Sequence, residues 1–146
     1  MENGAGRQGF GPRAGVGALA GLAALLALGA CAPEPAPPPG AIAYMDYCAI
    51  CHGRQARGDG VIATDLPVPP PDLTRISARN GGVFPLEQVA ATVFGYPGKH
   101  ESDLMPEFAP LLDGPPVTVR SAGGGEARMP QALGDLVLYL ETLQRP

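Results

Sequence analysis

The chain has 146 residues, with 10 Lys and Arg against 14 Asp and Glu, and a formal net charge of −4. This length allows one domain and a short additional segment. No run of basic residues occurs, which argues against nucleic acid as a partner.

The N-terminal segment has the pattern of an export signal. Residues 1–13 carry Arg7 and Arg13, and residues 14–30 follow without a charge. This run ends at Leu28-Gly29-Ala30-Cys31, which resembles the lipobox of bacterial lipoproteins, where the Cys is lipidated and becomes the mature N-terminus. We therefore expect residues 1–30 to be a lipoprotein-type signal peptide and Cys31 to anchor the protein on the periplasmic side of a bacterial membrane. Ordinary signal cleavage, which leaves a soluble periplasmic protein, is the alternative.

A proline-rich segment, residues 31–39, separates this signal from the rest of the chain. Such segments form semi-rigid extended spacers and cannot pack a core. We expect residues 31–39 to be a tether and residues 40–146 to be the folded domain. Loss of residues 1–30 removes two arginines and one glutamate, so the formal charge changes from −4 to −5.

The first predicted helix begins after the prolines 37–39 and carries a C-x-x-C-H string, Cys48 to His52. In an exported protein this string is typical of c-type haem attachment. Two thiols one helical turn apart can add to the two vinyl groups of a porphyrin. The adjacent imidazole of His52 is then held beneath the iron as its proximal ligand.

Three other interpretations of the cysteines explain less. A structural zinc site needs four ligands, and only Cys31, across the proline tether, is left over. A thioredoxin-like redox pair needs a strand–helix–strand context, which the flanking sequence does not predict. A disulfide between Cys48 and Cys51 leaves His52 unexplained.

Further helices are predicted after a glycine- and proline-rich stretch that follows His52. Asp72 is a candidate cap for a short helix that stops at Asn80-Gly81-Gly82, and Pro85 opens another with an apolar stripe up to Gly95. Residues 113–125 are rich in proline and glycine, and Val117 to Val119 could form at most a small strand. A last helix is predicted over residues 130–144, with Met129 as its cap and one broad apolar face.

A second axial ligand for an iron must come from elsewhere in the chain, and cytochromes c commonly use Met. Met45 shares the helix of Cys48 and Cys51 and is expected to pack in the core. Met105 lies in a loop-like stretch and is followed by a proline, so we expect it to be the distal ligand. Met129, at the predicted helix start, is the alternative. His100, between Lys99 and Glu101, is expected to be an exposed loop residue.

The chain resembles the class I cytochromes c. In that family a glycine lies eight residues before the first haem cysteine and an aromatic residue four before it, here Gly40 and Tyr44. The resemblance implies an all-α, small cytochrome c fold, whose N- and C-terminal helices cross around one covalently bound haem. It also implies that Gly40 and Tyr44 meet Tyr139 of the last helix. The carbonyl of one proline of the 69–71 cluster, for which we choose Pro71, would orient His52.

These features together predict an electron carrier and not an enzyme. One covalent haem c would be held by Cys48, Cys51, His52 and Met105, and would exchange electrons with redox proteins or membrane respiratory complexes. The net negative charge favours partners with a basic docking patch. The alternative is the haem subunit of a dehydrogenase or oxidase complex, or a small haem peroxidase, which would need an open or weakly held sixth position.

Overall fold

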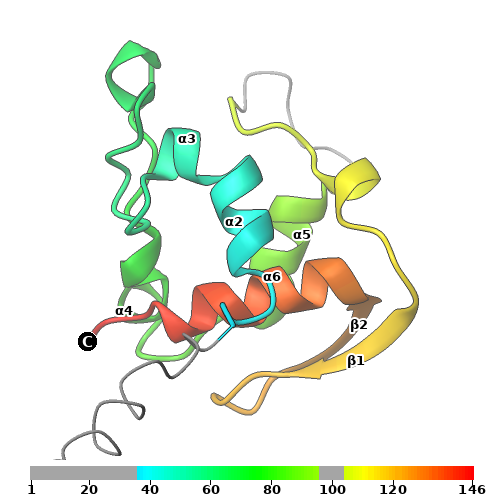
Figure 1. Ribbon diagram of the computed structural model, residues 1–146. Coiled ribbons are helices and arrows are strands. Elements are labelled where there is room, and N and C mark those ends of the chain that lie inside the picture. The colour runs from blue at the N-terminus through cyan, green and yellow to red at the C-terminus, as the bar shows by residue number, and fades with distance from the viewer. Residues whose placement is uncertain (1–35, 96–103) are drawn as a thin grey trace, which may run out of the picture. The chain divides into compact units, whose positions relative to one another are not determined.

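The computed structural model describes residues 36–95 and 104–146, and residues 37–146 group into one compact unit. Within these ranges the chain forms helices and one antiparallel pair of strands (Figure 1). The α-helices and strands follow in the order α2 (Ala41–Tyr47), α3 (Ala49–His52), α4 (Ile76–Arg79), α5 (Leu86–Phe94), β1 (Pro116–Arg120), β2 (Glu126–Pro130) and α6 (Gln131–Thr142). Short 3-10 helices lie at Ala63–Asp65, Leu73–Arg75 and Ala109–Leu111.

The core is built around α6, which contacts α2, α5 and both strands. Its inward side chains Leu136, Val137 and Leu140 are almost completely buried. The predicted apolar stripe of α5 is confirmed, since Leu86, Val89, Ala90 and Val93 are all buried. Apolar residues at helical spacing on both helices therefore supply a large part of the interior.

The prediction of an all-α fold is wrong, because residues 116–130 form a β-hairpin and the fold is mixed. The two strands pair in antiparallel register from Pro116 opposite Pro130 to Arg120 opposite Glu126. Val119 and Met129 are buried, while their strand neighbours are more exposed. This period-two alternation lets one face of the hairpin pack against α6. Figure 1 shows the hairpin running along that helix.

The predicted start of the last helix is also wrong by a small margin. Met129 is not a helix cap but the fourth residue of β2, and Pro130 is the N-cap residue of α6. The strand runs directly into the helix, because Pro130 has the extended backbone (φ −56°, ψ 145°) with which a strand can end. The consequence is that Met129 belongs to the sheet.

The short-helix predictions in the middle of the chain are confirmed. Asp72 caps the 3-10 turn Leu73–Arg75, since its carboxylate accepts hydrogen bonds from the Thr74 backbone N–H (2.8 Å) and hydroxyl (2.7 Å). These hydrogen bonds hold the pKa of Asp72 below its usual range, with the hydroxyl the largest contributor. The following helix α4 ends at Asn80.

Candidate functional site

The two cysteines of the C-x-x-C-H string lie on a nearly continuous helical segment made of α2 and α3. Cys48 stands at the junction of the helices, where its N–H donates to the Tyr44 carbonyl and its carbonyl accepts from the His52 N–H, both at 2.9 Å. The Cys48 side chain is buried, whereas Cys51, one turn later, is partly exposed, and both are free thiols. Burial, and to a lesser degree Cys51, raises the pKa of Cys48 to about 11. Cys48 therefore remains a thiol at neutral pH.

His52 ends this helical segment and is buried to 8 % exposure. Its ring Nδ1 lies 3.3 Å from the carbonyl oxygen of Pro71. Because a carbonyl only accepts, Nδ1 carries the proton, and Nε2 is the nitrogen with a free lone pair. Burial lowers the pKa of His52, although the Pro71 hydrogen bond partly opposes this effect. The ring is therefore a neutral imidazole with the tautomer that metal ligation through Nε2 requires, and the contact expected with Pro71 is confirmed.

Glycines in the loop after His52 bring the Pro71 carbonyl to this ring. Gly58 lies against the Pro70 backbone so closely that a Cβ there would come within 2.2 Å of the Pro70 carbonyl oxygen. A Cβ on Gly60 would likewise come within 2.2 Å of the Ile50 carbonyl oxygen in α3. The loop backbone therefore packs directly against α3 on one side and against the prolines 69–71 on the other. These glycines were not among the predicted site residues, although the pattern Gly58-Asp59-Gly60 is typical of a tight turn.

The predicted crossing of the first and last helices is confirmed. A Cβ on Gly40 would lie 2.2 Å from the Asp135 carbonyl oxygen and 2.7 Å from the Leu136 Cα, so the backbones touch directly. Tyr44 is completely buried, and its ring centroid lies 5.6 Å from that of Tyr139. The absent side chain of Gly40 allows the close approach, and the two rings fill the space beside it.

The three methionines of the described residues occupy two kinds of environment. Met45 and Met105 are partly buried and pack against the core. Met129 is buried in the core between β2 and α6, where a Cβ on Gly134 would lie 3.7 Å from the Met129 Cγ. His100 and Cys31 lie outside the described residues, as do the predicted signal peptide and most of the tether.

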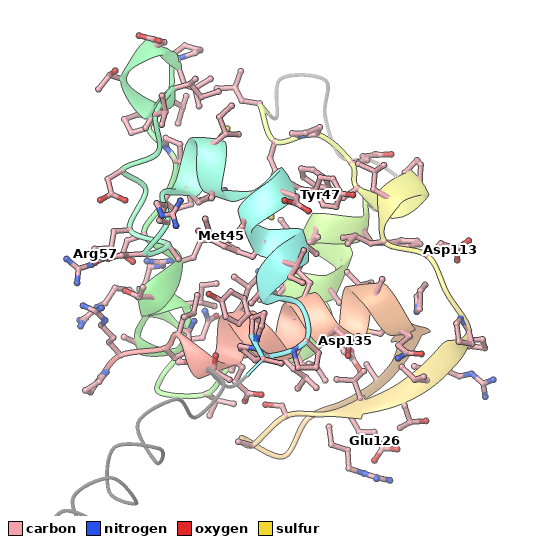
Figure 2. The ribbon with its side chains drawn as sticks, viewed as in Figure 1. Met45, Tyr47, Arg57, Asp113, Glu126 and Asp135 are labelled. Carbon is pink, nitrogen blue, oxygen red and sulfur yellow. The ribbon has the colours of Figure 1, made fainter. Side chains whose placement is uncertain are left out.

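The segment that carries Met105 contacts α5 and also α2, the helix that precedes Cys48. The Phe108 N–H donates to the Val93 carbonyl at the end of α5 (3.1 Å). The ring of Phe108 lies 6.4 Å, centroid to centroid, from that of Tyr47. Tyr47, which Figure 2 labels on α2, directly precedes Cys48. These contacts hold residues 104–108 near α2 without a regular element of their own.

The site residues fit a covalently bound haem. Two thiols stand one turn apart, a neutral imidazole follows at once, and Cys48 belongs to an apolar cluster with Ala49, Ala56 and Phe84. In the same described ranges, no three His, Cys, Asp or Glu side chains gather closely enough to hold a metal ion by themselves. No helix of the described residues is long and apolar enough to cross a membrane. Comparison with known proteins finds no match to the chain among protein-family models, curated proteins or solved structures.

Proposed function

We propose that this chain is an electron-transfer protein that carries one covalently attached haem c. The observation that carries the proposal is the neutral His52 ring, oriented by Pro71, directly after two thiols one helical turn apart. In this arrangement Cys48 and Cys51 would form the thioether bonds, and His52 Nε2 would ligate the iron. When bound, the haem supplies one-electron chemistry between its ferric and ferrous states.

The protein itself contributes rigidity and a dry environment. The Pro71 carbonyl fixes the orientation of the His52 ring and raises its basicity as a ligand. Cys48 and its apolar neighbours are buried, so they would keep water away from the thioether bond at Cys48.

We propose Met105 as the distal ligand in preference to Met129. Met129 is fixed in the register of β2 opposite Val117 and is packed against α6. To leave that position it would have to open the hairpin interface. Met105 lies in an irregular segment that is partly buried and is tied through Phe108 to Tyr47, beside the cysteines.

We propose a periplasmic location with an anchor at Cys31, and redox proteins or membrane respiratory complexes as partners. The support is the apolar run before Cys31, the proline-rich tether and the acidic balance of the domain. A tethered domain keeps a high effective concentration near membrane partners.

Haem attachment is tested by expressing the full chain with a c-type cytochrome maturation system. The protein should keep its haem on a denaturing gel and gain the mass of one haem. Its reduced pyridine complex should have the α band of a haem with two thioether bonds. The double substitution Cys48→Ser, Cys51→Ser should lose haem on the gel. A wild-type protein without covalent haem would refute the proposal.

The distal ligand is tested by the weak far-red charge-transfer band of the ferric protein. Met105→Ala should abolish this band, and Met129→Ala should keep it. Retention of the band in Met105→Ala would refute the assignment. Carbon monoxide binding by the unmodified ferrous protein would show an exchangeable sixth position and would favour a haem enzyme.

A further inference from the structure

The hydroxyl of Tyr44 makes a short buried hydrogen bond to the residue that follows His52. It donates to the Gly53 carbonyl oxygen at 2.6 Å, and Tyr44 has no exposed surface. Packing of an aromatic side chain at a helix crossing needs only the ring, which Phe would supply equally well. The hydroxyl therefore has a role beyond filling the crossing.

The Gly53 carbonyl is the first link of a chain of hydrogen bonds that leads to Pro71. It also accepts from the Ala56 N–H at 3.0 Å, and the Ala56 carbonyl accepts from the Leu73 N–H at 2.8 Å. Leu73 lies two residues after Pro71, whose carbonyl faces His52 Nδ1. These hydrogen bonds and the backbone from Leu73 to Pro71 therefore connect the Tyr44 hydroxyl to the His52 ring.

Two features make this path stiff. Ala56 is completely buried and has a left-handed backbone (φ 58°), which an alanine adopts only when its surroundings impose it. The Gly58 N–H donates to the His52 carbonyl at 2.8 Å and closes the loop back on α3. A displacement of the Gly53 carbonyl would therefore be passed to the Pro71 segment and would not be absorbed by the loop.

The hydroxyl is protonated at neutral pH and can therefore donate. Burial, with smaller contributions from Cys48, Tyr139 and Asp59, raises the pKa of Tyr44 well above its usual range. A group that stays protonated can hold the Gly53 carbonyl permanently.

We propose that Tyr44 is a positioning residue for the proximal haem ligand: its hydroxyl, through Gly53, Ala56 and Leu73, holds the Pro71 carbonyl against His52 Nδ1. The inference rests on the proposed haem function. A firmly held carbonyl makes the imidazole a stronger electron donor, which stabilises ferric iron and lowers the reduction potential.

The test compares Tyr44→Phe with Tyr139→Phe in the haem-loaded full chain. Both variants keep the ring pair at the crossing and lose one hydroxyl each, and no hydrogen bond of the described residues uses the Tyr139 hydroxyl. In Tyr44→Phe, exchange of the His52 Nδ1 proton, followed by NMR, should accelerate by up to about fivefold, the factor for one ordinary hydrogen bond. The reduction potential should rise. Tyr139→Phe should change neither quantity.

A second variant covers the case in which Tyr44→Phe fails to fold. Site-specific 3-fluorotyrosine at position 44 keeps the hydroxyl and makes it a stronger donor, so it should slow the exchange and lower the potential. Unchanged exchange and potential in a folded Tyr44→Phe protein, or equal changes in Tyr139→Phe, would overturn the inference. Failure of the haem function is seen separately, as a wild-type protein without covalent haem.

Discussion

Replacement of Gly40 by Ala tests the helix crossing most directly. Gly40 combines a left-handed backbone (φ +82°) with direct contact between the backbones of α2 and α6. An added Cβ would lie 2.2 Å from the Asp135 carbonyl oxygen, where an ordinary contact is at least 3.4 Å. The helices would have to separate by about 1.2 Å at this point.

The cost has two parts. The left-handed backbone costs an alanine about 1–2 kcal/mol. Forcing extra volume into a close-packed contact costs about 1–3 kcal/mol more, because Tyr44 and Leu136, both completely buried, lose their fit. We expect Gly40→Ala to lower the free energy of unfolding by about 2–5 kcal/mol, a large part of the stability of a small domain.

Gly82→Ala is the matched control for this prediction. Gly82 has nearly the same backbone angle (φ +88°), but a Cβ there would meet nothing within 4 Å. Urea unfolding of the two variants and the wild type, followed by circular dichroism, separates the steric cost from the backbone cost. If Gly40→Ala loses no more stability than Gly82→Ala, the close backbone contact between α2 and α6 at Gly40 is refuted.

Three other predictions concern the core, a cap and the anchor. Leu136→Ala should lower the free energy of unfolding by about 2–5 kcal/mol, whereas Leu111→Ala, at a side chain that is 54 % exposed, should change it by less than about 0.5 kcal/mol in the same urea titration. Asp72→Ala should cost about 1 kcal/mol at neutral pH. Because the folded-state pKa of Asp72 is lowered, this contribution is present above the ordinary pKa of 3.8 and is lost as the pH falls through the lowered value. The stabilities of the wild type and Asp72→Ala should therefore converge in acid-unfolding curves. Cys31→Ser should release the protein from membranes in a fractionation experiment; a variant that stays bound would refute lipid anchoring.

The helices were predictable because their apolar residues recur at helical spacing. The stripe from Leu86 to Val93 and the face from Leu133 to Leu140 are both buried as that spacing requires. The crossing at Gly40 was predictable only through the resemblance to a known family. Helical periodicity does not show which two helices touch.

The hairpin was missed although its sequence alternates. Val117-Thr118-Val119 and Ala127-Arg128-Met129 each place apolar residues on one face, and five residues that include three glycines separate the strands. The strands are short and prolines stand at both outer ends of the hairpin, so the segment resembled an irregular loop. Strand pairing depends on contacts between separate segments, so each segment alone gave a weak signal.

One supporting contact of the site was predictable, since the Pro71 contact of His52 was expected from the resemblance, whereas the haem-binding roles of the string stay predictions. The C-x-x-C-H string names Cys48, Cys51 and His52 by itself, because the chemistry demands that order. The hydrogen bonds from Tyr44 through Gly53 and Ala56 to Leu73 all end on backbone carbonyl oxygens, and the sequence alone does not indicate which carbonyls these are.

The crossing of α2 with α6 also affects the order of events during synthesis. These helices stand at opposite ends of the described sequence, so a chain that emerges N-terminus first reaches residue 48 long before residue 131 is made. Until then α2 has no partner against which to bury Tyr44, and the core cannot close. We therefore expect Cys48, which is buried in the finished fold, to be more exposed until the core closes.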